Sequence, residues 1–130
     1  MTNADAVVLF AHGSRDPLWR GPIDAVARQM QTQQPGLKVC CAFLELTEPD
    51  LPHAVTDLVA QGAQRIRIVP MFLGVGRHAR EDLPALIHSL QAQHPNVAIT
   101  CQPAVGEQER LLDLLADIAL NPTDNTPQKA

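Results

Sequence analysis

Apolar residues along the chain fall into short continuous runs, separated by longer stretches in which they are spaced differently. The runs are rich in β-branched side chains and do not alternate strictly between apolar and polar positions. This pattern is typical of strands that are covered on both faces. It predicts four strands, at residues 6–11, 39–44, 66–73 and 97–101.

The stretches that follow these runs have the spacing of amphipathic helices, with one apolar stripe on each. Asp82 and Pro84 suit the start of the third helix, because aspartate caps helices and proline is tolerated in the first turn. The predicted stripes are Ile23, Val26, Ala27 and Met30; Val55, Leu58 and Val59; Leu83, Leu86, Ile87 and Leu90; and Leu111, Leu114, Leu115 and Ile118.

The alternation of strands and helices predicts a single α/β domain over residues 1–120. Strands joined by helices pair in parallel through right-handed crossovers, which place helices on both faces of the sheet. Residues 121–130 are polar, contain two prolines and show no apolar period. We therefore expect a disordered C-terminal tail there.

Composition narrows the class of protein. The chain of 130 residues has a formal net charge of −4, which gives no reason to expect nucleic-acid binding. No apolar stretch has the length of a membrane helix, and the first residues lack the basic region of a signal peptide. A cytoplasmic protein without a membrane partner is the resulting expectation.

The three cysteines, Cys40, Cys41 and Cys101, show no C-x-x-C spacing. Neighbouring residues of a strand point to opposite faces of the sheet. Cys40 and Cys41 are therefore expected neither to share a metal ion nor to form an ordinary disulfide. Buried, reduced thiols are the interpretation that fits a cytosolic protein.

Polar side chains with metal-binding or proton-accepting chemistry follow three of the predicted strands. His12 follows the first strand, Glu45 the second and His78 the third. Ligands of parallel α/β sheets bind beyond the carboxyl ends of the strands, where the strand order reverses. A strand order of 2-1-3-4 would bring these three side chains to one crevice, where they could bind a divalent metal or accept protons.

Four arginines lie within a few residues of these histidines, so an acidic small molecule could be held there despite the net negative charge. Gly74 and Gly76 could simply make a turn, or they could let the backbone pass close to a flat ligand. No phosphate-binding loop, dinucleotide fingerprint or nucleophile elbow is present. The candidate substrate-binding residues are Ser14, Arg15, Arg20, Gly76, Arg77 and Arg80.

Three motifs resemble the small CbiX-type sirohydrochlorin chelatases, which are class II chelatases. The first is the segment VVLFAHGSR at residues 7–15, and the second is AFLE at residues 42–45 followed by Glu48-Pro49. The third and most specific is VPMFLGVGRH at residues 69–78, followed by Asp82-Leu83-Pro84. Their order and spacing agree with the family up to about residue 118.

This resemblance implies a flavodoxin-like domain and an ATP-independent enzyme, a sirohydrochlorin cobalto- or ferrochelatase of cobalamin or sirohaem biosynthesis. His12 and His78 would match the metal-site histidines, with Glu45 as an acidic catalytic residue. No permanent cofactor is implied, and Co²⁺, Fe²⁺ or Ni²⁺ would be a substrate beside the tetrapyrrole. Larger relatives hold the tetrapyrrole between two such domains, so the short form is expected to be a homodimer.

The sequence does not show which histidine binds the metal and which accepts protons, because the two roles compete for one imidazole lone pair. Either histidine could be the ligand or the base. Two other functions also stay open. One is a non-catalytic carrier of tetrapyrrole or metal with the same fold, and the other is an interaction module whose histidines are structural.

Overall fold

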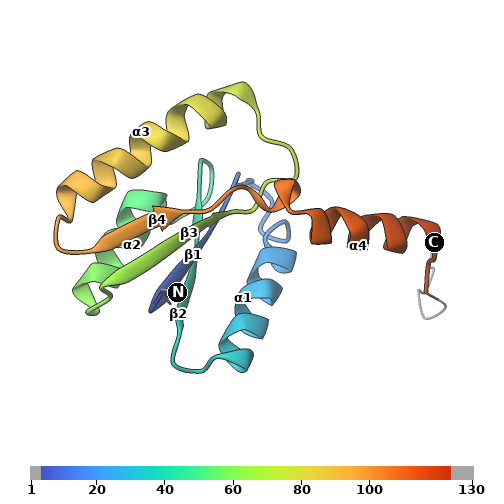
Figure 1. Ribbon diagram of the computed structural model, residues 1–130, viewed down its shortest axis with the longest axis horizontal. Coiled ribbons are helices and arrows are strands. Elements are labelled where there is room, and N and C mark those ends of the chain that lie inside the picture. Colours follow the sequence, from blue (N-terminus) through green and yellow to red (C-terminus); the bar gives the residue numbers. More distant parts are fainter. Residues whose placement is uncertain (1–3, 124–130) are drawn as a thin grey trace.

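The structure is a computed structural model that describes residues 4–123, with every side chain in that range except that of His78. The tail predicted at residues 121–130 therefore lies largely outside the described residues. Strands and helices alternate along the chain as the apolar pattern predicts (Figure 1). The strands are β1 (Ala6–Ala11), β2 (Lys38–Phe43), β3 (Arg65–Pro70) and β4 (Ala98–Cys101).

The sheet is parallel throughout, with the order β2-β1-β3-β4. The predicted fold class and strand order are thus confirmed. β1 lies inside the sheet and is buried along its whole length, which explains its continuous apolar run. The β1–β3 junction joins strands that are not consecutive in the chain, so the strand order reverses there.

Helices α1 (Gly21–Gln33), α2 (Leu51–Ala60) and α3 (Arg77–Gln93) connect successive strands. A short 3₁₀ turn, η1 (Val105–Glu107), leads from β4 into α4 (Glu109–Leu120). Within residues 4–123, no helix combines the length and apolarity needed to cross a membrane.

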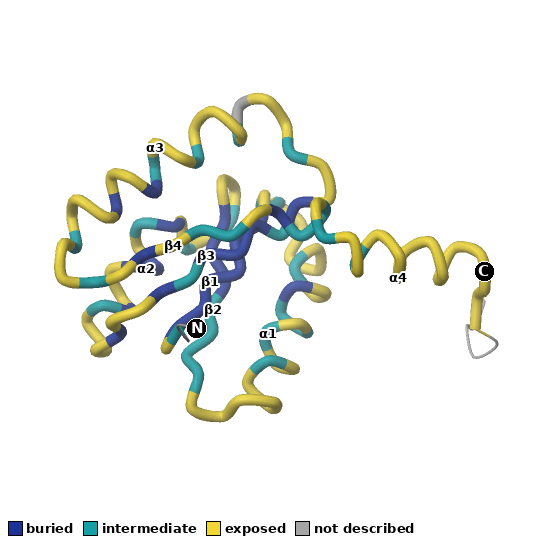
Figure 2. Tube along the Cα trace, viewed as in Figure 1, coloured by how far each residue is buried: buried dark blue, intermediate teal, exposed yellow. Residues whose placement is uncertain are grey.

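Two apolar clusters form the core, one on each face of the sheet. The larger cluster lies beneath α2 and α3 and includes Val8, Ile66 and Leu90. The smaller cluster lies beneath α1 and includes Leu9 and Ile23. Figure 2 shows this burial concentrated along the strands, while α4 is exposed over almost its whole length.

Cys40 and Cys41 belong to opposite sides of the core, as predicted from their adjacency in a strand. Cys40 packs against the cluster beneath α2 and α3, and Cys41 is buried in the cluster beneath α1. The three cysteines are free thiols. Burial raises the pKa of both Cys40 and Cys41 to about 11, with neighbouring negative charge adding to the effect.

The start of α3 differs from the prediction. The helix begins at Arg77 with Gly76 as its N-cap, and the Arg80 N–H donates to the Gly76 carbonyl at 3.0 Å. Asp82 is therefore not the cap, and Pro84 lies in the interior of the helix rather than in its first turn. A local capping signal was misleading here because the extended backbone of Gly76 begins the helix earlier.

Candidate functional site

The loops after β1 and β2 continue the pairing of the two strands beyond the sheet. The Leu44 N–H donates to the Ala11 carbonyl at 2.8 Å, and the Glu45 N–H donates to the His12 carbonyl at 3.0 Å. His12 and Glu45 are therefore neighbours across this extended ladder. Both residues are exposed at the carboxyl edge of the sheet, where ligands of this fold class bind.

Gly13 allows the two loops to approach this closely. Its φ is +102°, and a Cβ atom at this position would lie 1.7 Å from the Glu45 carbonyl oxygen. A side chain is thus excluded both by conformation and by space. The Ser14 N–H donates to Thr47 Oγ1 and Thr47 Oγ1 donates to the Ser14 carbonyl, each at 2.9 Å. These two hydrogen bonds hold the loops after β1 and β2 together.

Phe72 supports the imidazole ring of His12 from the β3 side. The two ring centroids lie 4.5 Å apart with their planes tilted by 40°. Phe72 is only 2% exposed, and its own ring meets the edge of Phe10 at 5.9 Å. A buried aromatic residue therefore holds one face of an exposed histidine, leaving the imidazole nitrogens for hydrogen bonds, protons or a metal ion.

His78 is the second residue of α3, which starts soon after β3 ends. Its backbone therefore follows the β3 loop at the same edge of the sheet as His12 and Glu45. Its side chain lies outside what the structure describes, so a meeting of the two imidazoles stays a prediction. Among the described side chains, no group of three histidine, cysteine or carboxylate residues is placed to hold a metal ion.

The four candidate arginines are in different environments. Arg20 binds Asp24 through Nε at 2.9 Å and Nη2 at 3.1 Å, and its guanidinium lies 4.7 Å from the centroid of the Phe43 ring. The hydrogen bond to Asp24 raises the pKa of Arg20. Arg20 is therefore already paired with a carboxylate, on the α1 face of the sheet.

The other three arginines are exposed. Arg77 pairs with Glu81 at 3.3 Å, and Arg80 Nη1 donates to the Val75 carbonyl at 2.7 Å. Arg15 is exposed in the loop after β1. Exposed ion pairs are weak, so Arg77 can exchange Glu81 for an acidic ligand. The exposed Arg15 and Arg80 can also turn to such a ligand more easily than the half-buried Arg20 can.

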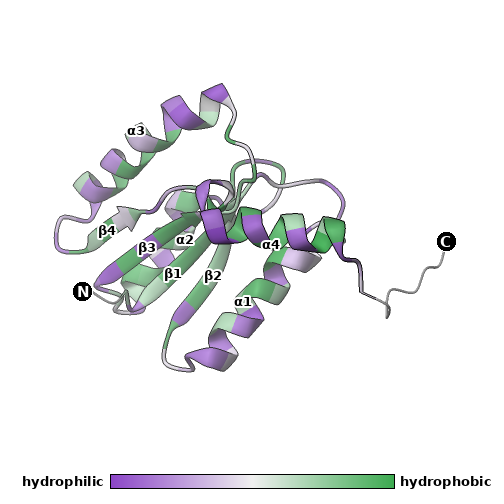
Figure 3. Cartoon of the chain, turned by 45° about the vertical axis from the view of Figure 1, so that its right-hand side comes forward, coloured by the Kyte–Doolittle hydropathy of each residue, from purple (hydrophilic) through white to green (hydrophobic). Residues whose placement is uncertain are grey.

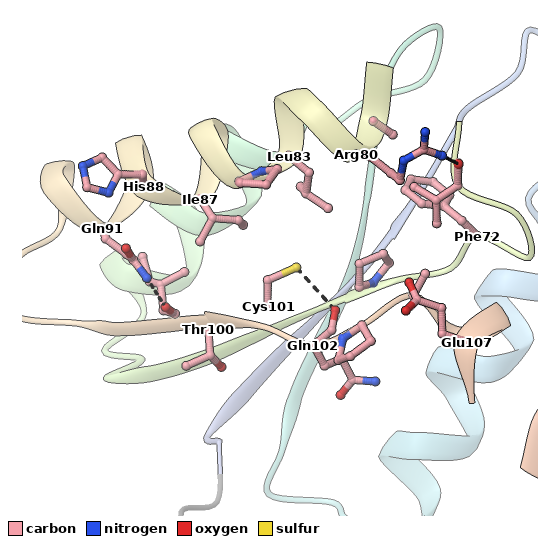
Figure 4. Close-up of a pocket in the computed structure, with 17 residues that line it drawn as sticks. Phe72, Arg80, Leu83, Ile87, His88, Gln91, Thr100, Cys101, Gln102 and Glu107 are labelled. Atoms are coloured by element: carbon pink, nitrogen blue, oxygen red, sulfur yellow. Dashed lines mark hydrogen bonds between the residues drawn. The ribbon is translucent and has the colours of Figure 1, made fainter. Parts of the chain in front are cut away.

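A cavity of about 700 Å³ opens beside this edge of the sheet, between α3 and β4. Its lining is mostly apolar: Leu83 and Ile87 of α3 point toward Cys101 of β4, and Phe72 and Arg80 lie at one end (Figure 4). Phe72 thus contributes both to the cavity and to the support of His12. Sequence reasoning found neither this cavity nor the roles of Phe72 and Thr47, because all three depend on contacts between distant segments.

The ends of β1 and β2 thus place an imidazole and a carboxylate at the carboxyl edge of a parallel α/β domain, beside its topological switch point. The CbiX family model matches residues 6–120. The chain belongs to the CbiX family.

Relatives of the chain are of two lengths. It is 34% identical over 117 residues to the sirohydrochlorin ferrochelatase of Priestia megaterium, covering 87% of this chain but 42% of that protein. It is 27% identical over 139 residues to the sirohydrochlorin cobaltochelatase of Methanocaldococcus jannaschii, covering 88% of this chain and 97% of that protein. The chain thus spans less than half of the first relative and nearly all of the second.

A solved structure shows the same fold. The crystal structure of a CbiX protein assigned to cobalamin biosynthesis, from Marinobacter aquaeolei VT8, superposes with a TM-score of 0.76. The two chains are 33% identical, and the match covers 88% of this chain and 93% of the other.

Proposed function

We propose that the protein inserts a divalent metal ion into sirohydrochlorin without consuming ATP. The observation that carries this proposal is the juxtaposition of His12 and Glu45 at the carboxyl edge of the sheet, beside the switch point, in a chain of the CbiX family. The names of its relatives, cobaltochelatase and ferrochelatase, support Co²⁺ or Fe²⁺ as the metal substrate. Ni²⁺ is a third candidate, since imidazole and carboxylate ligands suit all three ions.

The reaction sets the roles of the residues. A divalent ion replaces the two pyrrole protons of the free macrocycle, so the site must deliver M²⁺ and accept two H⁺. We assign metal delivery to His12 and His78 and proton acceptance to Glu45, with one histidine able to share the second role. The exposed Arg15, Arg77 and Arg80 would bind peripheral carboxylates of the tetrapyrrole, with Ser14 and Gly76 beside the macrocycle.

The functional unit in this proposal is a homodimer. The match covers 42% of the Priestia enzyme, as expected if a second copy supplies what the rest of the longer chain supplies there. The described site also exposes His12 and Glu45 rather than enclosing them. A second copy facing this edge would shield a bound macrocycle from water.

The test is an absorbance assay with purified protein, sirohydrochlorin and Co²⁺, Fe²⁺ or Ni²⁺. His12→Ala and His78→Ala are each expected to lower the insertion rate by about 100-fold, a typical effect of losing a general base or a ligand. His53→Ala is the matched control, because His53 is exposed and bound to Asp50 on α2. It is expected to retain the full rate.

The results separate the candidate functions. Stoichiometric binding of sirohydrochlorin or metal without turnover would identify a carrier. If neither sirohydrochlorin nor metal binds, the result would favour the interaction module whose histidines are structural. If the protein turns over but both alanine variants match the wild type, the site assignment is wrong.

A further inference from the structure

Phe72 is the residue that the structure places against the imidazole ring of His12. The two ring centroids lie 4.5 Å apart, and among the described side chains the His12 ring has no hydrogen-bond partner. Phe72 itself is buried in the larger core cluster, where its ring lies 5.9 Å from that of Phe10. The orientation of the His12 ring therefore depends on the position of Phe72.

Side-chain packing alone leaves Phe72 room to move. Phe72 lines the cavity of about 700 Å³ between α3 and β4, and Figure 4 shows it with Glu107 at the same end of that cavity. An aromatic ring beside an empty apolar space lacks contacts on that side, so it can turn into the space at little steric cost. Holding Phe72 against His12 therefore requires a constraint on the backbone of Phe72.

Two hydrogen bonds from neighbouring segments constrain the backbone at Phe72. The Met71 N–H donates to the Phe10 carbonyl at 2.7 Å, which continues the pairing of β3 with β1. The Gly106 N–H donates to the Phe72 carbonyl at 3.0 Å. Gly106 is the middle residue of η1, so the turn that follows β4 supplies the second of these constraints.

Gly106 also lies too close to this backbone for any side chain to fit. A Cβ atom at Gly106 would lie 1.7 Å from the Leu73 carbonyl oxygen and 2.5 Å from the Leu73 carbonyl carbon. The turn is held by the core, because Ala104 at its start is buried in the larger cluster. Helix α4 follows the turn with hydrophobic residues recurring along it (Figure 3), but it is exposed over almost its whole length and contributes little to holding the turn.

We propose that Gly106 is a positioning residue for His12 and acts through Phe72. The hydrogen bond from Gly106 and its close approach to Leu73 keep the ring of Phe72 against the imidazole and out of the cavity. A ligand or base works at its full rate only while its supporting residues hold its orientation. The effect on metal insertion rests on the proposed function, whereas the effect on the His12 ring does not.

Three substitutions separate this role from that of an ordinary turn glycine. Gly106→Ala must move η1 and the Leu73 backbone apart by roughly 1 Å or more, and it is expected to release Phe72. Ala104→Gly adds no atom but gives the turn more conformational freedom, so it should have a smaller effect in the same direction even if the alanine variant does not fold. Gly36→Ala is the matched control, because a Cβ atom there would meet nothing within 4 Å.

Proton–carbon NMR of the His12 ring, without metal or tetrapyrrole, measures the effect on its position. The aromatic ring of Phe72 shifts the resonances of the His12 ring protons, and Phe72→Leu gives their values without that ring. The His12 resonances of Gly106→Ala are expected to move most of the way toward those of Phe72→Leu, while those of Gly36→Ala stay in place. If Gly106→Ala and Ala104→Gly both keep the wild-type resonances, the proposal is overturned.

A double-mutant cycle on metal insertion tests whether Gly106 acts through Phe72. Phe72→Leu and Gly106→Ala are each expected to lower kcat about 10-fold, while KM for sirohydrochlorin changes by less than about twofold. The double variant should also lose about 10-fold, whereas independent residues would together lose about 100-fold. A loss of about 100-fold, or a raised KM with an unchanged kcat, overturns the proposal. A wild-type chain that inserts no metal contradicts the proposed function instead, and the NMR comparison alone then decides whether Gly106 positions His12.

Discussion

At the scale of single residues, the surroundings of a side chain decide its chemistry more than its type does. His12 and His53 are both exposed histidines. The ring of His12 rests on buried Phe72, whereas Nδ1 of His53 lies 2.6 Å from a carboxylate oxygen of Asp50. Among the described side chains, the ring of His12 contacts an apolar surface and has no hydrogen-bond partner, whereas the ring of His53 is paired with a carboxylate.

The Asp50–His53 pair predicts a defined pH dependence. The hydrogen bond to Asp50 raises the pKa of His53, and the bonds from His53 lower the pKa of Asp50. The contribution of His53 to stability is full below its unfolded pKa and is lost as pH rises through its raised pKa. The contribution of Asp50 is present above its unfolded pKa and is lost as pH falls through its lowered pKa.

Proton NMR titration of the His53 ring measures this effect. The pKa of His53 is expected above 6.5 in the wild type and lower in Asp50→Asn, since asparagine still caps α2 but has no charge. One molar salt should reduce the shift, because the pair is exposed. An unchanged pKa in the asparagine variant would show that Asp50 is not the cause.

The cysteines give a second residue-scale prediction. With a pKa of about 11, Cys40 and Cys41 carry little thiolate at pH 8, and the thiolate is the reactive form. A chromogenic disulfide reagent is expected to react with them at least tenfold more slowly in the native protein than in 6 M guanidinium chloride. Equal rates in the two solvents would mean that these thiols are not protected by burial.

At the scale of elements, two glycine turns are expected to differ in how much an added side chain lowers the free energy of unfolding. Gly13 and Gly62 both have positive φ, but only at Gly13 would a Cβ meet another atom, the Glu45 carbonyl oxygen. Gly13→Ala is expected to lower the free energy of unfolding by at least about 3 kcal/mol, because steric overlap adds to backbone strain. Gly62→Ala, with strain alone, is expected to lose about 1–2 kcal/mol. Urea denaturation measures both variants, and equal losses would mean that the close approach is not rigid.

Most of the elements could be predicted from the sequence because their signals are local. The continuous run of β1 and the stripe of α1 depend only on residues close together in the chain. The start of α3 could not be predicted in this way, since Asp82 and Pro84 carry a capping signal that the preceding loop overrides. The two hydrogen bonds between Ser14 and Thr47 join residues 33 positions apart, and no local sequence pattern indicates them.

At the scale of the whole molecule, the arrangement of the strands could be predicted from the sequence, but the exposure of α4 could not. The strand order 2-1-3-4 was predicted from the flavodoxin-like resemblance and not from the apolar pattern, and it accounts for His12 and Glu45 sharing one edge. The exposure of α4 was not predictable, because its stripe has the same spacing whether it packs on its own sheet or on another chain. An amphipathic period specifies that a helix is covered but not by what.

Concentration dependence of thermal unfolding tests the proposed homodimer in the intact protein. If unfolding separates two copies, mass action raises the Tm as protein concentration rises. A hundredfold dilution is therefore expected to lower the Tm of the wild type by several degrees. A wild-type Tm that does not change with concentration would contradict a homodimer in which folding and association are coupled.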